Sequence, residues 1–226
     1  MIELVNIRKS FNTGKPNEFV AIHGVSLSID SEKATVFRGP SGSGKTTLLS
    51  MIGCLARPTS GRIRLNGQEI TSLPERFLTE IRQKTFGFMF QQFNLIKGVT
   101  ALENVMLPAC PSGEKHSSLK RRAMDLLETF KISQKALSNV EWLSGGEAQR
   151  VAICRALINN PSVIIADEPT ANLDTKLSHE FMEIMGRLKG EGKMILIASH
   201  DPLVYELSLI DRIIDLRDGR IDGSGS

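Results

Sequence analysis

The chain has 226 residues, of which 41% are hydrophobic and 23% are charged, and its formal net charge is +3. These values are typical of a globular protein with one large domain or two small ones. The small net charge speaks against a nucleic-acid partner, which requires a clustered basic surface. No apolar run in the sequence approaches the roughly 20 residues that cross a membrane as a helix.

The first part of the chain is predicted to form antiparallel strands. Residues 2–8 and 20–29 alternate apolar and polar side chains, as strands with one buried face do. The stretch RIRLN at 62–66 reads as a third strand, because Gly67 follows it as a turn residue.

Three later segments are short, continuous apolar runs, at residues 35–37, 163–166 and 194–198. Such runs indicate parallel strands that are covered on both faces. Helical patterns at 45–55 and 175–189 follow the first and second of these strands. The alternation of strand and helix predicts an α/β core.

Two more helices are predicted at 117–131 and 147–158, between the first two core strands, where they could form a separate helical lobe. The segment 212–222 is predicted to be a hairpin that turns at Asp218-Gly219.

The most specific motif is GPSGSGKT at residues 39–46, which matches the phosphate-binding loop G-x-x-x-x-G-K-[ST]. Gly39 and Gly44 are expected to allow positive φ angles, which aim successive N–H groups at phosphate. Lys45 would contact the β- and γ-phosphates, and Thr46 would offer its hydroxyl to Mg²⁺. The remaining candidate nucleotide contacts in this loop are Pro40, Ser41, Gly42, Ser43 and Thr47.

A second motif, VIIADEP, places two carboxylates at the end of an apolar strand. Asp167 is expected to hold Mg²⁺ from the edge of the sheet beside the phosphate-binding loop. The next side chain, Glu168, would project to the opposite side, because side chains alternate along a strand. There it could orient or deprotonate an attacking water.

Together these motifs resemble the nucleotide-binding subunit of ABC transporters. GPSGSGKT matches its Walker A motif, VIIADE its Walker B motif, and LSGGE at 143–147 the signature of that superfamily, in the same order. The resemblance covers essentially the whole chain. It implies a P-loop NTPase fold in one ABC ATPase domain, residues 1–226. The expected parts are a RecA-like core with a mixed or parallel sheet and an antiparallel β subdomain (about 1–91 and 161–222), a helical signature subdomain (about 92–160) and a tail (223–226).

Further positions take their roles from this resemblance. Gln91 matches the Q-loop glutamine, a contact of Mg²⁺ and water, with Gln92 as the alternative assignment. Asp174 ends the D-loop, and His200 matches the switch histidine that contacts the γ-phosphate. Phe11 matches the aromatic position that stacks on adenine, for which only the face of the ring is needed.

The resemblance also implies partners. Ser144, Gly145, Gly146 and Glu147 would contact the ATP that a second copy of the chain holds, so that two ATP molecules join a homodimer. Glu147 stands where the signature often has Gln, and Glu141-Trp142 before it is also unusual. A separate integral membrane permease-type protein would insert a coupling helix into a groove near 91–107, and ATP hydrolysis would drive that protein.

The stretches RPTSG, FGFMFQQFNL, TALENVMLP, ADEPTANLD and DGRI resemble the LolD/MacB/FtsE subgroup, which serves lipoprotein release, macrolide export and cell division. Cys54, Cys110 and Cys154 form no C-x-x-C pair, which favours a reducing compartment. The N-terminal MIELVNIRKSF lacks the apolar stretch of a secretory signal. We therefore expect a cytoplasmic protein at the inner face of the membrane, bound there through its membrane partner.

Two other function classes remain as alternatives. A non-transport ABC ATPase of DNA repair carries a long coiled coil between Walker A and the signature, and the interval from Thr46 to Leu143 shows no sustained heptads. The translation type carries two cassettes in one chain, whereas this chain has one. A P-loop kinase would leave LSGGE and His200 without a role.

Overall fold

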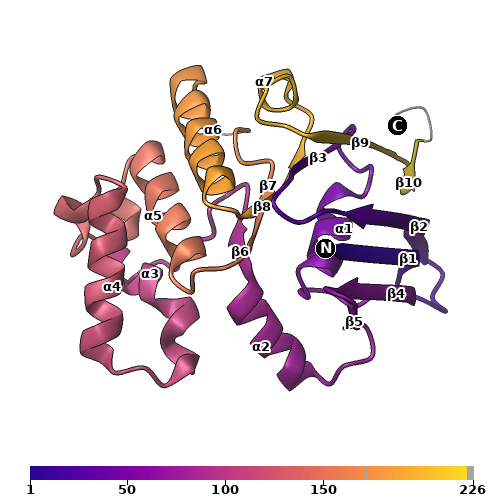
Figure 1. Ribbon diagram of the computed structural model, residues 1–226, viewed down its shortest axis with the longest axis horizontal. Coiled ribbons are helices and arrows are strands. Elements are labelled where there is room, and N and C mark those ends of the chain that lie inside the picture. Colours follow the sequence, from indigo (N-terminus) through magenta and orange to yellow (C-terminus); the bar gives the residue numbers. More distant parts are fainter. Residues whose placement is uncertain (172, 223–226) are drawn as a thin grey trace.

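Two sheets and a group of helices make up the computed structural model, which describes residues 1–171 and 173–222 (Figure 1). The smaller sheet is antiparallel, with strand order β2-β1-β4-β5. Its strands are β1 (Ile2–Phe11), β2 (Phe19–Ile29), β4 (Ser60–Leu65) and β5 (Gln68–Glu69).

The larger sheet has the order β10-β9-β3-β8-β7-β6, and it is parallel except for the terminal β9–β10 hairpin. Its strands are β3 (Ala34–Arg38), β6 (Phe86–Met89), β7 (Val163–Asp167), β8 (Met194–Ser199), β9 (Arg212–Arg217) and β10 (Arg220–Ile221). The α/β core, the antiparallel strands and the final hairpin are thus confirmed.

Helices cover both faces of the larger sheet. The α-helices are α1 (Lys45–Ile52), α2 (Glu75–Thr85), α3 (Ala101–Met106), α4 (His116–Thr129), α5 (Gly145–Leu157), α6 (Thr175–Gly190) and α7 (Pro202–Tyr205). Short 3₁₀ helices lie at Leu107–Ser112, Ser133–Lys135 and Val140–Trp142. Helices α3, α4 and α5 form a group beside the sheet (Figure 1).

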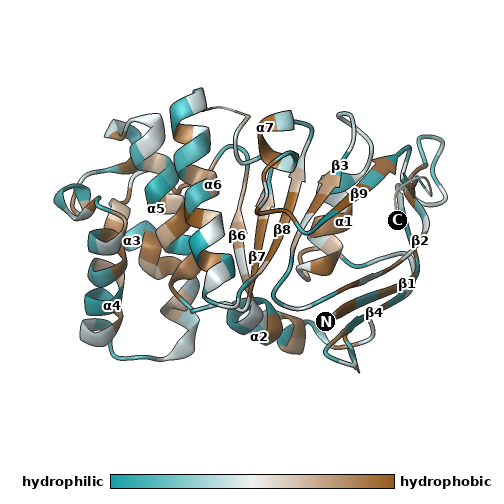
Figure 2. Cartoon of the chain, turned by 45° about the horizontal axis from the view of Figure 1, so that its top comes forward, coloured by the Kyte–Doolittle hydropathy of each residue, from teal (hydrophilic) through white to brown (hydrophobic). Residues whose placement is uncertain are grey.

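Strand alternation explains why the larger sheet separates two hydrophobic cores. In β8, Ile195 and Ile197 join the core of α3–α6, whereas Leu196 and Ala198 join the core of α1 and the antiparallel sheet. All four side chains are buried, and the brown strands at the centre of Figure 2 show this continuous apolar character. A strand buried on both faces accounts for the apolar runs seen in the sequence.

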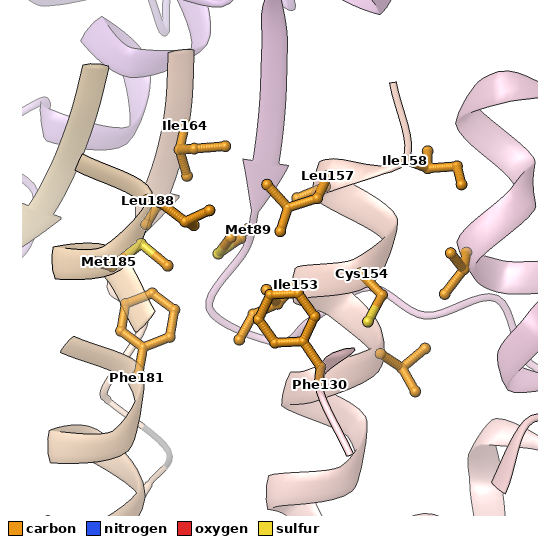
Figure 3. Packing of buried hydrophobic residues seen from close by; sticks show 14 of the residues in the cluster. Met89, Phe130, Ile153, Cys154, Leu157, Ile158, Ile164, Phe181, Met185 and Leu188 are labelled. Atoms are coloured by element: carbon orange, nitrogen blue, oxygen red, sulfur yellow. The ribbon is translucent and has the colours of Figure 1, made fainter. Parts of the chain in front are cut away.

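Helices α3, α4, α5 and α6 all contribute to the core on the helical side. Figure 3 shows Phe181 and Met185 of α6 on one side and Ile153 and Leu157 of α5 on the other, with Met89 at the end of β6 between them. This packing holds α5 rigidly against the sheet, as expected from its largely apolar sequence.

Strand β6 and helices α2 and α3 were not predicted. The sequence of β6, Phe-Gly-Phe-Met, is short and contains a glycine, which weakens the strand signal. The structure shows why that glycine is needed: a Cβ atom on Gly87 would lie 2.4 Å from the Ala156 carbonyl oxygen of α5. The packing of α5 against β6 therefore requires glycine at this position.

The division into a core and a helical part at 92–160 remains a prediction, although α3, α4 and α5 fall within that range. The predicted tail at 223–226 lies outside the described residues. Among the helices that the structure describes, none combines the length and the apolar character that crossing a bilayer requires.

One buried polar side chain organises the segment before α3. Asn104 is fully buried; its side-chain oxygen accepts from the Ile96 N–H at 2.7 Å, and its amide donates to the carbonyls of Ile96 and Thr100 at 3.0 and 3.1 Å. Buried amides are retained where such bonds satisfy them. Asn104 thereby ties the loop after Gln91 to α3.

We predict that Asn104→Ala lowers the free energy of unfolding by about 2–4 kcal/mol, because it removes three hydrogen bonds and leaves the Ile96 backbone groups unsatisfied. Urea unfolding followed by circular dichroism measures this change. Gln134→Ala is the control, since that exposed side chain makes a single bond of 3.4 Å and should change stability little. Equal effects of the two substitutions would contradict the role given to Asn104.

Candidate active site

The candidate site is assembled where three parallel strands end. In the register of the larger sheet, Arg38 of β3 pairs with Ser199 of β8, and Asp167 of β7 pairs with Ala198. The residues that follow these strands therefore emerge at the same edge. They are the loop 39–44, Glu168 and His200, as is usual for ligand sites in open parallel sheets.

The glycines of the loop 39–44 are required for two different reasons. Gly42 and Gly44 have φ angles of 80° and 101°, which favour glycine. Gly39 does not have a positive φ, so that expectation was wrong. It is glycine because a Cβ atom there would lie 2.1 Å from the Leu216 carbonyl oxygen of β9. The loop is thus packed directly onto the sheet.

Lys45 opens α1 and points its ammonium group back into the loop. Its side chain is only 5% exposed, and Nζ donates to the carbonyl oxygens of Gly39 and Pro40 at 2.6 and 3.0 Å. Glu168 Oε1 lies 3.2 Å from the same nitrogen. A buried charge needs such partners, and these contacts hold a positive charge at the centre of the phosphate-binding loop.

Asp167 and Thr46 form the part of the site that is suited to a cation. The Thr46 hydroxyl donates to Asp167 Oδ1 at 2.9 Å. Burial raises the pKa of Asp167, and the charge of Glu168 raises it further, against the opposing effect of the Thr46 hydrogen bond. A nearby divalent cation would relieve this unfavourable burial of negative charge.

The oxygen atoms of Thr46 and Asp167 fit Mg²⁺ only as part of its coordination shell, with other ligands completing it. Among the described residues, no group of three or more His, Cys, Asp or Glu side chains could hold a metal ion by itself. Mg²⁺ in nucleotide sites is held by one or two protein oxygens together with phosphates and water. One hydroxyl and one carboxylate at this edge match that chemistry.

Glu168 lies beyond the end of β7 and has a φ of 46°, which is rare for a residue with a side chain. Its N–H donates to the Ala198 carbonyl at 2.9 Å, and its Oε2 lies 3.0 Å from His200 Nδ1. The sequence predicted the direction of the Glu168 side chain from the alternation of side chains along a strand. In the structure, this backbone conformation sets that direction instead. His200 is 61% exposed, whereas Glu168 is 14% exposed.

A cavity of about 480 Å³ opens over the loop. Residues 41–47, which are predicted to bind phosphate, line one part of it, and aromatic residues line another. Phe11 at the end of β1 stacks on Phe19 at the start of β2, with ring centroids 5.2 Å apart and planes 19° apart. Phe19 was missed by the sequence argument, although the antiparallel pairing of Phe11 with Phe19 follows once the hairpin register is known. The full lining is Phe11, Phe19, Val20, Ala21, His23, Ser41, Gly42, Ser43, Gly44, Lys45, Thr46, Thr47, Gln91, Glu168, Asp218 and Gly219.

Gln91 belongs to this cavity, and Gln92 is not among the residues that line it. The chain after Gln91 is held by helix α5. Arg155 donates to the carbonyl oxygens of Phe93 and Asn94, two residues with φ angles of 56° and 48°. Burial lowers the pKa of Arg155. The segment that carries Gln91 is thus fastened to the same helix that begins at the signature.

The signature residues 144–147 lie elsewhere. They begin α5 and are not among the described residues that line the cavity. Ser144 is the N-cap; its hydroxyl accepts from the Glu147 N–H at 3.4 Å, and Glu147 Oε2 accepts from the Ser144 N–H at 2.8 Å. This capping box leaves the N–H groups of Gly145 and Gly146 without an acceptor inside the helix.

The negative charge of Glu147 is compensated by neighbouring groups. Its Oε1 lies 3.5 Å from Lys135 Nζ, and the Ser144 backbone hydrogen bond, together with Lys135, lowers the pKa of Glu147. Asp174 is likewise outside the cavity lining and acts as the N-cap of α6, where it accepts from the Leu177 N–H at 2.9 Å.

Comparison with known proteins decides the family. Residues 22–171 match the family model described as ABC transporter. The chain belongs to the ABC transporter family. It is an ATP-binding cassette, the ATPase subunit of that family, with the ATP-binding motifs described above.

Individual members of the family are similar over nearly the whole chain. The lipoprotein-releasing system ATP-binding protein LolD 1 of Rhodopseudomonas palustris is 40% identical, covering 99% of each chain. The macrolide export ATP-binding/permease protein MacB of Chlorobaculum tepidum is 41% identical over 97% of this chain, which spans 33% of that longer protein.

Solved structures of the cassette MJ0796 are also similar. A dimeric structure has a TM-score of 0.90 and 39% identity, covering 98% of this chain and 97% of that one. A second dimeric structure of MJ0796, in a post-hydrolysis state bound to ADP and Pi, has a TM-score of 0.90 at 38% identity with the same coverage.

We predict that Lys45→Ala weakens ATP binding by about 10- to 100-fold, because it removes a buried charge-assisted contact to phosphate. Isothermal titration calorimetry measures the affinity. Lys84→Ala is the matched control, since Lys84 is 75% exposed on α2. Unchanged affinity in Lys45→Ala would reject the role of this loop.

Proposed function

We propose that this cassette works as an ATP-sandwich homodimer that drives a separate membrane protein. The observation that carries the proposal is the position of Ser144, Gly145 and Gly146, which present a helix N-terminus outside the chain's own nucleotide cavity. Helix N-termini with unpaired N–H groups attract phosphate. Two copies arranged head to tail would place each signature on the γ-phosphate that the other copy holds. The dimeric structures of MJ0796 support this arrangement.

In this proposal each group at the strand ends has a defined task. Lys45 neutralises charge on the β- and γ-phosphates, and Ser41–Thr47 donate to phosphate oxygens. Phe11 and Phe19 offer their ring faces to the adenine. Glu168 orients the attacking water and accepts its proton, and His200 holds Glu168 in place from 3.0 Å and faces the γ-phosphate.

The metal ligands remain part of the proposal. Thr46, Asp167 and Gln91 would hold Mg²⁺, which supplies positive charge to the phosphates during transfer. The Thr46–Asp167 hydrogen bond already places two of these groups side by side. Asp174, as the cap of α6, holds the start of that helix after the D-loop segment.

We predict that Glu168→Gln lowers ATP hydrolysis by about 100-fold or more, because the amide cannot accept the proton of water. ATP should still bind, so the variant should accumulate as a dimer with Mg-ATP in size-exclusion chromatography. Glu128→Gln, an exposed change on α4, should hydrolyse ATP normally and remain mainly monomeric. If Glu168→Gln with Mg-ATP elutes only as a monomer, the sandwich arrangement is wrong.

The proposed membrane partner would dock in a second cavity of about 450 Å³. This groove lies between α2, β6 and the start of the helical group. Leu55, Ile96 and Leu107 are three large apolar side chains that line it and remain about half exposed. Arg155, which holds the carbonyl oxygens that follow Gln91, also lines it. An occupant of the groove would therefore contact the element that positions Gln91.

The names of the relatives support the class of partner. LolD and MacB name proteins of lipoprotein release and macrolide export, and we propose the same subgroup for this chain. The cassette would sit on the cytoplasmic face of the membrane. Its cysteine usage agrees with a reducing compartment.

We predict that a photo-crosslinking amino acid at Leu107 forms a covalent adduct with an integral membrane protein in the native host. The same amino acid at Val5, which is similarly exposed but lies on β1, should not form it. Mass spectrometry of the adduct identifies the partner. Crosslinking that is equal at both positions, or absent at both, would contradict docking in this groove.

A further inference from the structure

The most exposed large apolar side chains of the described structure lie just before the signature. Leu137 is 78% exposed and Trp142 is 74% exposed, and both belong to the segment between α4 and α5. Trp142 is the only tryptophan in the sequence. Most tryptophans are largely buried, and an exposed one is typical of interaction surfaces.

The backbone that carries Trp142 is held firmly. Ala101 N–H donates to the Ser138 carbonyl and Leu102 N–H to the Ala136 carbonyl, both at 2.9 Å. On the other side of the same loop, the Gly98 N–H donates to Glu141 Oε1 at 2.7 Å. Because this backbone is already ordered, a partner that covers the indole does not have to order the segment as well. The segment 136–142 thus carries the indole on a preorganised backbone.

The position of Trp142 suggests what covers it. It precedes Ser144 by two residues, so the two Cα atoms are at most about 7 Å apart. A surface that closes on Ser144 and Gly145 can therefore be reached by the indole. In the proposed dimer that surface is the rim of a nucleotide cavity, where Ser41 and Gly42 of the loop are exposed.

We infer that Trp142 is an interface anchor that packs against the nucleotide-loaded loop of a second copy of this chain. The inference rests on the proposed sandwich dimer and adds to it a residue that neither the signature nor the phosphate-binding loop contains. Burial of the indole would begin only when both cavities hold ATP, because that state brings the signature onto the loop. Trp142 would then contribute to dimer affinity without contributing to nucleotide binding in the monomer.

Because Trp142 is the only tryptophan, tryptophan fluorescence, excited where tyrosine does not absorb, reports on this position alone. In the Glu168→Gln chain, Mg-ATP should shift or quench the tryptophan emission, with the same dependence on protein concentration as dimer formation. Mg-ADP should leave the emission unchanged, and so should Mg-ATP added to Glu168→Gln/Lys45→Ala. Dimer formation with unchanged emission would overturn the inference.

A second measurement compares dimer affinities by analytical ultracentrifugation. In the Glu168→Gln background, Trp142→Ala should weaken dimerisation by about 10- to 100-fold and Trp142→Phe by less, as truncation of an anchor does. ATP affinity of the monomer should stay the same. Leu137→Ala is the matched control, since it is equally exposed in the same segment but seven residues from Ser144.

The outcomes distinguish failure of the sandwich dimer from failure of the role of Trp142. If Glu168→Gln itself does not dimerise with Mg-ATP, the proposed function fails. If it dimerises and Trp142→Ala dimerises equally well, only the role of Trp142 fails. Loss of crosslinking to the membrane protein in Trp142→Ala, with dimer affinity unchanged, would assign the indole to that partner and overturn the inference.

Discussion

The parallel register of β3, β8 and β7 is the constraint on which the site depends. Because these strands are neighbours and run in the same direction, their carboxyl ends meet at one edge of the sheet. Lys45 follows β3, Glu168 follows β7, and His200 follows β8, although as many as 155 positions separate them in the numbering. A shift of one residue in any strand would turn the preceding core side chains to the wrong face. The two hydrophobic cores therefore also maintain the alignment of the candidate site at this edge.

The ion pair of Lys45 with Glu168 compensates a buried positive charge within the chain. A lysine side chain with 5% exposure requires anionic or carbonyl partners for its ammonium group, and Glu168 supplies the anionic one at 3.2 Å. Glu168 is in turn held by His200 and by a left-handed backbone that is uncommon outside glycine. Such strained residues cluster at functional sites, where the surrounding structure overcomes their cost. Glu168 thus links Lys45 on one side with His200 on the other.

Helix α5 connects the signature, the segment after Gln91 and the groove beside β6. Its N-terminus presents Gly145 and Gly146, its middle packs on α6, and Arg155 near its end holds the segment after Gln91. The groove beside β6 is lined by the same arginine and by Ala156. A displacement of α5 would therefore reach the signature, the Gln91 segment and the groove together. The close approach at Gly87 and the hydrogen bonds of Asn104 make this connection stiff.

The sequence by itself determined the motifs, the α/β class and most of the strands, because apolar runs, glycine spacing and the Lys45–Thr46 pair carry their physical meaning locally. It also identified Asp167 and Glu168 as site residues from the chemistry of a strand end, and Phe11 and His200 through the family resemblance, and these assignments remain predictions for experiment. Only the tertiary structure showed that Phe19 stacks on Phe11, that Gly39 is required by contact with Leu216, and that β6 joins the sheet against α5. It also decided the direction of Glu168 and the exposure of Trp142. These features depend on which distant segments pack together, and no local pattern of residues contains that information.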